Sequence, residues 1–270
     1  MKNPISRVRA SSLAACAASV IVTSAGAAVS YSTSFEAPFT TGMLAGQQGW
    51  VTSAGGGSTA YQVANVAGRA RTGTQYLTYS TASTVGSNWQ WFEPQAQTAT
   101  DLADPASSIV RASVWVNVFA ASAATGVTRI SYAGLDCYDI TGAGRLGFIR
   151  VGSNGAIELN NGTSSIGGTI TGFALNQWNK VSIEFDYGAD KLRWYLNDVQ
   201  INTSAVAGFD TFTATTFGDA DIYGTRSTAT GTTTGGHTLL WDDYSVQTIP
   251  APGAIALLGV AGLVGARRRR

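Results

Sequence analysis

Two tryptophans alternate with polar residues in the segment Asn88-Trp89-Gln90-Trp91. Residues two apart lie on the same face of a β-strand, so both indoles are expected on one side. Exposed, they would form a flat platform on which sugar rings stack, with Asn88, Gln90 or Gln95 supplying hydrogen bonds. Buried, they would belong to the core, where large aromatic side chains in strands are common. The spacing leaves both interpretations open.

Asp219 and Asp221 have the same two-residue spacing and are also expected on one strand face. Carboxylate oxygens are the ligands that Ca²⁺ prefers, which makes this pair a candidate calcium site. His237, the only histidine, is expected to be solvated in a loop, and no G-x-S-x-G motif is present. A hydrolase built on a serine–histidine pair is therefore not indicated.

The elements that would position these residues are β-strands. Alternation of apolar and polar residues predicts strands over Val110–Val118 and Gly147–Val151. It also predicts a hairpin from Trp178–Tyr187 and Lys191–Asp198, joined by a turn at Gly188-Ala189-Asp190.

Composition agrees with an all-β domain. Only 12% of the 270 residues are charged, and 32 are glycine, which suits a sandwich or barrel. We expect one domain over residues 29–248, with Thr228–Gly236 as a surface loop. Seven of the 17 cations lie at the chain ends, which leaves ten against 16 acidic residues. This mildly acidic middle gives no electrostatic reason to expect nucleic acid as a partner.

Residues 1–28 are typical of a secretory signal peptide. Three cations, Lys2, Arg7 and Arg9, precede an apolar stretch from Leu13 to Ala25. An A-x-A site predicts cleavage after Ala27, with Ala28 as a near alternative, so the export machinery is an expected partner. Cys16 would be removed with this leader. Cys137 would then be the single thiol of the mature protein, which excludes an intramolecular disulfide and a zinc site made of cysteines.

Residues 249–270 combine a small proline-containing motif, a short apolar segment and four arginines. The motif contains Pro250, Ala251, Pro252 and Gly253, and the chain closes with Arg267, Arg268, Arg269 and Arg270. This order resembles a PEP-CTERM sorting tail, with Ala251 in place of the usual glutamate. The resemblance implies an exosortase-type transpeptidase that cuts near Pro250–Pro252, after transient membrane anchoring, and a destination at the cell surface or outside the cell. The arginines would hold the end of a hydrophobic C-terminal helix in the cytoplasm. A plain tail anchor is the alternative.

Three patches resemble concanavalin A-like, laminin-G-like jelly rolls. They are the hairpin Trp178–Asp198, the start Ser34–Phe39 with Gly46–Trp50, and the close Leu239–Val246. The resemblance implies an antiparallel two-sheet jelly-roll sandwich in which the first and last strands pair. That pairing would bring Glu36 close to Asp242 and Asp243, where related binding modules hold a structural calcium. The alternative is that Glu36 caps a strand end and both aspartates are solvated; no other cofactor is expected.

Laminarinase-type glycosidases share this fold class and carry an E-x-D-x-x-E motif. Glu184 and Asp186 match its first two positions, but Asp190 replaces the last glutamate and falls in the hairpin turn. A glycoside hydrolase with Glu184 and Asp186 in a cleft is therefore an alternative function. The expected function is non-catalytic binding of polysaccharide at the cell envelope or in the extracellular matrix. A structural surface protein without a sugar site is the other alternative.

Overall fold

The structure is a computed structural model that describes residues 28–52, 61–79, 86–92, 108–119, 131–170, 172–213, 216–226 and 238–250. These residues form strands joined by turns and loops, with no helix among them. The strands are β1 (Ala28–Thr33), β2 (Gly42–Met43), β3 (Trp50–Thr52), β4 (Tyr61–Ala64), β5 (Tyr76–Tyr79), β6 (Gly86–Phe92), β7 (Ser108–Phe119), β8 (Tyr132–Tyr138), β9 (Arg145–Gly152), β10 (Ile157–Asn160), β11 (Ser165–Ile170), β12 (Asn179–Asp186), β13 (Lys191–Leu196), β14 (Val199–Gln200), β15 (Asp219–Arg226) and β16 (Thr238–Pro250).

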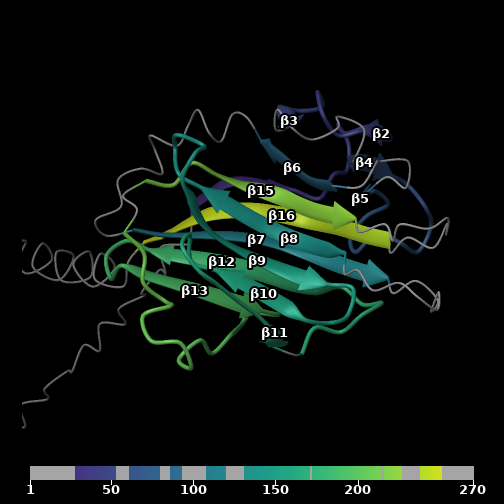
Figure 1. The fold of residues 1–270 in the computed structure, drawn as a ribbon. Coiled ribbons are helices and arrows are strands. Elements are labelled where there is room, and N and C mark those ends of the chain that lie inside the picture. Colours follow the sequence, from purple (N-terminus) through teal and green to yellow (C-terminus); the bar gives the residue numbers. More distant parts are fainter. Residues whose placement is uncertain are drawn as a thin grey trace, which may run out of the picture.

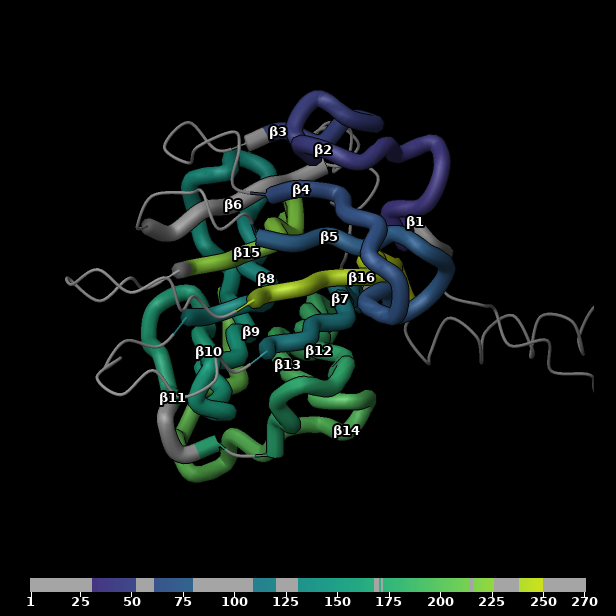
Figure 2. The backbone as a smooth tube through the Cα atoms, turned by 90° about the vertical axis from the view of Figure 1, so that its right-hand side faces the viewer, coloured from purple at the N-terminus to yellow at the C-terminus, as the bar shows by residue number. Residues whose placement is uncertain are grey.

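The strands form two antiparallel sheets packed face to face (Figure 1). In the described part of the chain, one sheet has nine strands in the order β14-β13-β12-β7-β16-β5-β4-β2, with β1 paired to β16. The other has seven strands in the order β11-β10-β9-β8-β15-β6-β3. Figure 2 shows the two layers side by side. The expected all-β sandwich is confirmed.

The predicted strands and hairpin are present. β7 and β9 extend the expected segments by one or two residues at each end, and β12 pairs with β13 from Val181↔Leu196 to Asp186↔Lys191. Asp190 takes a positive φ of 52° in the turn, a conformation that aspartate adopts more readily than most residues. The first and last strands also pair, with Ala28↔Thr248 at one end and Thr33↔Tyr244 at the other. The last strand continues through Ile249 to Pro250, two residues past the expected domain boundary at 248.

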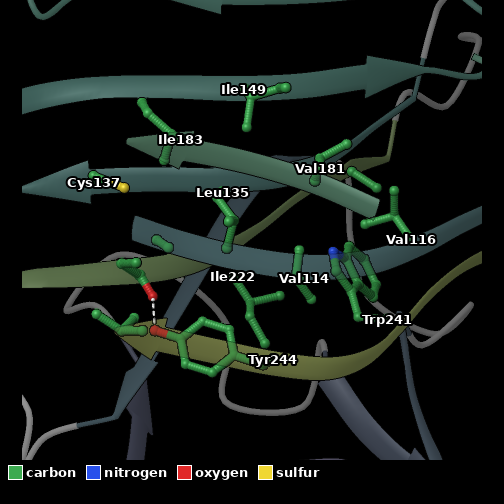
Figure 3. Close-up of a cluster of buried hydrophobic side chains, with 14 of the residues drawn as sticks. Val114, Val116, Leu135, Cys137, Ile149, Val181, Ile183, Ile222, Trp241 and Tyr244 are labelled. Carbon is green, nitrogen blue, oxygen red and sulfur yellow. Dashed lines mark hydrogen bonds between the residues drawn. The ribbon is translucent and has the colours of Figure 1, made fainter. Parts of the chain in front are cut away.

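The core lies between the sheets, and strand alternation decides which residues enter it. Val114 and Val116 of β7 are buried there with Val181 of β12 and Leu135 of β8 (Figure 3). Trp241 and Tyr244 of β16 fill the space between the layers, and the Tyr244 hydroxyl donates a hydrogen bond of 2.7 Å to the Ala220 carbonyl. Cys137 is part of this core as a buried free thiol, and burial raises its pKa well above the ordinary value. The alternate residues of the same strands point outward and carry the polar groups.

Candidate functional site

A β-bulge in β16 interrupts the pairing of that strand with β7. The register with β7 shifts between Asp242 and Ser245, so that Asp242 lies opposite Trp115 and Ser245 opposite Ser113. Asp243 takes a positive φ of 45° within the bulge. Bulges redirect side chains, and non-glycine residues with positive φ are often found where a structure has a special task. The bulge is therefore a candidate position for a functional site.

Pairing of β1 with β16 brings Glu36 and the two aspartates to the same loop, Arg71–Gln75. The Glu36 carboxylate accepts hydrogen bonds of 2.6 Å from the backbone N–H groups of Thr74 and Gln75. Asp242 accepts backbone hydrogen bonds of 2.9 Å from Arg71 and 3.2 Å from Thr72. These carboxylates thus accept hydrogen bonds from backbone N–H groups of a loop that lies outside the strands.

Asp243 holds the side chains of the same loop. Its carboxylate forms an ion pair with the guanidinium of Arg71 and accepts a 2.8 Å hydrogen bond from the Thr72 hydroxyl. The Arg71 guanidinium carbon lies over the ring of Trp115, 3.6 Å from its centroid. Cation–π stacking and the ion pair together fix the position of the indole.

The environments of these carboxyl groups differ in electrostatics. Hydrogen bonds, chiefly the one from the Gln75 backbone, lower the pKa of Glu36. Burial raises the pKa of Asp242 to about 6, against the opposing effect of the hydrogen bonds that it accepts. Asp242 is fully buried and accepts hydrogen bonds from the loop. A change in its protonation state is therefore coupled to the conformation of the loop.

The geometry of these three carboxylates fits a hydrogen-bonded loop better than a calcium ion. Ca²⁺ requires six to eight oxygen ligands. Here the oxygens face N–H groups, a hydroxyl and a guanidinium, all of which a cation would have to displace. Among the described residues, no group of three acidic, histidine or cysteine side chains is arranged to hold a metal ion. Calcium binding by Glu36, Asp242 and Asp243 stays a prediction for a metal titration.

A groove of about 740 Å³ opens beside the bulge. It is lined by Tyr31, Ser32, Thr33, Ser34, Glu36, Ala37, Pro38, Phe39, Gln48, Trp115, Lys180, Asp243, Tyr244 and Ser245. Ser32 and Ser245, both in its lining, are register partners in the pairing of β1 with β16. We call this feature the bulge groove.

Trp115 differs in its position from the tryptophans of the core. Trp50, Trp194 and Trp241 are fully buried. Trp115 instead falls between the core residues Val114 and Val116, on the outward phase of β7, and lines the bulge groove. The period-two pattern of β7 contained this signal.

Glu184 and Asp186, the candidate catalytic residues of the hydrolase alternative, lie on the same outer face of the nine-stranded sheet as Trp115. They line neither the bulge groove nor the second cavity described below. The Glu184 side chain is 6% exposed and is held by Arg111 (Nε–Oε2 2.9 Å), by Arg193 (Nη1–Oε1 3.0 Å) and by the hydroxyl of Tyr195 (3.2 Å). Asp186 shares Arg193 at 3.0 Å. A catalytic carboxyl group must be open to substrate, whereas both oxygens of Glu184 are already engaged by guanidinium groups and a hydroxyl. The geometry does not support catalysis by Glu184 and Asp186.

The tryptophans singled out in the sequence belong to the other sheet. The backbone of β6 pairs with β15, with Trp89 opposite Tyr223, Asn88 opposite Gly224 and Gln90 opposite Ile222, whereas Trp91 pairs with Val51 of β3. Their side chains lie outside the described residues. The prediction of a sugar-stacking platform stays a prediction.

Asp219 and Asp221 belong to β15, which pairs with β6. Their side chains lie on the side of β15 that faces away from the core. Both are nearly buried, at 7% and 5% exposed, and they share a hydrogen bond between their carboxyl groups. Burial raises the pKa of Asp219 to about 6 and raises the pKa of Asp221 well above its ordinary value. One oxygen of each, Oδ1, has no hydrogen-bond partner.

A buried ion pair beside this dyad escaped the sequence analysis. Asp136 of β8 is the register partner of Asp221 and is fully buried. Arg150 of β9 contacts both of its carboxylate oxygens, and its guanidinium stacks 3.5 Å from the ring centroid of Tyr223. Nothing local in Leu135-Asp136-Cys137 indicates that partner, because it comes from another strand.

Several sequence predictions fall outside the described residues: the signal peptide through Ala27, the tail from Ala251 onward with Pro252, Gly253 and the four arginines, and His237. Ala28, the alternative cleavage position, is the first residue of β1. Among the described residues, no helix is long and apolar enough to cross a membrane.

No model of a known protein family matches the sequence, and no curated protein matches it. Among solved structures, the chain is similar to the endo-1,3-β-glucanase from Streptomyces sioyaensis, with a TM-score of 0.54 and 14% identity over 84% of this chain and 98% of that chain. The fold is a jelly roll. At this identity the similarity shows the fold alone.

Two further jelly-roll similarities are weaker. The carbohydrate-binding module CBM66 from Bacillus subtilis has a TM-score of 0.42 and 12% identity, over 76% of this chain and 99% of that chain. The alginate lyase AlyC3 has a TM-score of 0.40 and 9% identity, over 64% and 75% of the two chains. With TM-scores below 0.5, neither similarity supports an inference about this jelly roll.

Proposed function

We propose that the jelly-roll domain binds polysaccharide without cleaving it, and that the bulge groove is the binding site. The observation that carries this proposal is the lining of the groove. It combines an indole ring at Trp115 with the hydroxyl groups of Ser32, Thr33 and Ser34 and with the charged groups of Lys180 and Asp243. Sugars are bound by this combination, because aromatic rings cover their apolar faces while polar groups hydrogen-bond their hydroxyls.

The electrostatics support binding rather than hydrolysis at this groove. The carboxylate of Asp243 is engaged by Arg71 and Thr72, and Glu36 is engaged by backbone donors of the loop. Glycoside hydrolysis needs one carboxylate free to act as nucleophile or base and one protonated acid across a cleft. The groove contains hydrogen-bonding groups in fixed positions, which suits recognition.

Binding to insoluble and soluble polysaccharides, including β-1,3-glucan, cellulose and alginate, tests the proposal. We expect Trp115→Ala to weaken the binding constant at least about tenfold, as the loss of one aromatic stacking partner in a binding site does. Trp178→Ala is the matched control, since Trp178 is also half-buried but does not line the groove.

Three other outcomes have defined meanings. Loss of binding in Trp89→Ala or Trp91→Ala, with Trp115→Ala unaffected, would move the site to β6 and the seven-stranded sheet. No binding by a folded protein to any polysaccharide would favour the structural surface protein. Release of reducing sugars would favour a hydrolase.

Export is part of the proposal and is supported by the leader at residues 1–28 and the PEP-CTERM-like tail at residues 249–270. Cell fractionation with mass spectrometry of both ends tests it. We expect a mature N-terminus after Ala27 or Ala28 and, in cells with an exosortase-type transpeptidase, a new C-terminus near Pro250–Pro252. An uncut protein in the cytoplasm would reject export.

A further inference from the structure

A second cavity, of about 740 Å³, lies at the open side of the sandwich. It is bounded by β11, the edge strand of the seven-stranded sheet, and β14, the edge strand of the nine-stranded sheet. Figure 2 shows these two strands at the same side of the molecule. The segment after β14, from Ile201 to Val206, completes the wall. We call this cavity the edge pocket.

The chemistry of the edge pocket differs from that of the bulge groove. Seven branched aliphatic side chains line it: Ile157, Ile166, Ile170, Leu196, Val199, Ile201 and Val206. Of the described residues in its lining, none is charged and none is aromatic. Its polar members are uncharged amides and hydroxyls, from Ser165, Gln200, Asn202 and Thr203.

The pocket runs from the core to the solvent. Ile157 is fully buried, and Ile166 and Leu196 pack against the core from a partly buried position. Val199 is 70% exposed and Val206 is 41% exposed at the rim, although both are aliphatic. Exposed aliphatic residues at an edge strand are a liability unless something covers them. A ligand that enters the pocket would cover them.

We propose that the edge pocket binds a single alkyl chain that carries an uncharged, hydroxyl-bearing head group. The aliphatic walls match a flexible alkyl chain, and the absence of aromatic residues from the described lining makes a stacked sugar ring a poor occupant. Because the described lining offers no charge to pair with an ionic head group, a neutral head is favoured. Gln200, Asn202 and Thr203 supply hydrogen bonds to its hydroxyls. The volume lies within the range of about 300–1,000 Å³ that is common for small-molecule sites.

The test is calorimetric titration of the full chain with n-octyl β-D-glucoside below its micelle-forming concentration. Glucose serves as the head group alone, and sodium octyl sulfate as the same alkyl chain with an anionic head. We expect saturable binding of the glucoside, and affinity for octyl sulfate lower by about tenfold or more because its charge would be desolvated without a partner.

Variants locate the binding. Val199→Asp and Val206→Asp should each weaken octyl glucoside at least about tenfold, because they place a charge in the apolar rim. Val66→Asp is the matched control, since Val66 is 53% exposed and does not line the pocket. All variants have the same N-terminal and C-terminal segments. A difference in octyl glucoside affinity between the pocket variants and the control is therefore attributed to the substituted residues.

The proposal is overturned if Val199→Asp and Val206→Asp bind octyl glucoside as tightly as the unaltered chain. It is also overturned if glucose alone displaces the glucoside. Trp115→Ala should leave octyl glucoside binding unchanged, so failure of polysaccharide binding and failure of alkyl-chain binding are separate results.

Discussion

The backbone nitrogen of Arg71 lies 2.9 Å from the carboxylate of Asp242, a residue 171 positions later in the chain. The next residue, Asp243, pairs with the guanidinium of the same arginine. The adjacent aspartates of the bulge therefore fix both the backbone and the side chain of one loop residue. That loop in turn fixes Trp115 at the wall of the bulge groove, which makes the groove sensitive to changes in the loop.

Gly73 lies in this loop at a position where a larger side chain would be strained. Its φ is +61°, and an added Cβ would lie 2.3 Å from Oε1 of Glu36. We expect Gly73→Ala to lower the free energy of unfolding by more than the roughly 1–2 kcal/mol of a left-handed alanine, because Glu36 must also move. Urea unfolding measures this. Gly142→Ala is the control, with a φ of +68° and no atom within 4 Å of the new Cβ; equal losses in both variants would contradict the role of Glu36.

The aspartate dyad predicts that stability falls as pH rises. The folded-state pKa of Asp219 is raised by burial to about 6, and the pKa of Asp221 is raised further, so the folded protein binds more protons than the unfolded chain. The contribution is fully present below the unfolded pKa of about 3.9 and is lost as pH rises through 6 and above. Asp242, with a pKa of about 6, adds to the same loss.

Thermal melts between pH 4.5 and pH 8 measure this dependence. We expect a lower Tm at pH 8, and a smaller decrease in Asp221→Asn, where one fewer buried carboxyl group has to ionise. Asp210→Asn is a control of opposite sign, because a hydrogen bond from Lys191 lowers the pKa of Asp210. A decrease of the same size in Asp221→Asn and the unaltered chain would show that the dyad is not responsible.

The buried pair of Asp136 and Arg150 should be far more costly to break than a surface pair. Asp136 is fully buried and the Arg150 side chain is 12% exposed. Arg150→Met should cost about 3–5 kcal/mol, since it removes the guanidinium that contacts both oxygens of a buried carboxylate and leaves the more distant Arg145, at 3.4 Å. Lys180→Met, which breaks the more exposed pair with Asp198, should cost about 1 kcal/mol or less. Chemical denaturation compares them, and recovery in the double variant Asp136→Asn, Arg150→Met would support the assignment.

Calcium is expected to have little effect on stability. The carboxylates of Glu36, Asp242 and Asp243 already accept hydrogen bonds from loop Arg71–Gln75. Melts in millimolar CaCl₂ and in EDTA should give the same Tm, because a bound ion would first have to displace these donors. A clear rise in Tm with calcium, abolished in Asp243→Asn, would establish the metal site that the sequence predicted.

Local pattern was enough to predict the strands, the hairpin of β12 and β13, and the sandwich. Residues such as Val181 and Ile183 alternate with polar neighbours over a few positions, and this period is set by strand geometry. Pairing of β1 with β16 followed from the resemblance of the chain ends to jelly rolls. The bulge groove could not be predicted in the same way, because its lining comes from β1, β7, β12 and β16 and depends on one register shift.

Glu184 illustrates how a sequence motif can mislead. Its spacing from Asp186 matched a catalytic pattern, but Arg111 comes from β7 and Arg193 from β13, on either side of the strand. Only the register shows that both arginines are directly opposite Glu184. The same limit concealed Arg150 as the partner of Asp136.

The pairing of Ala28 with Thr248 also determines how the domain can be presented on a surface. Its first and last described strands run side by side, so the chain enters and leaves the sandwich at one end of the same sheet. Attachment through a segment before Ala28 or through one after Pro250 would therefore hold the domain in nearly the same orientation. If the proposed export and binding hold, either mode of tethering would leave the bulge groove facing the same direction.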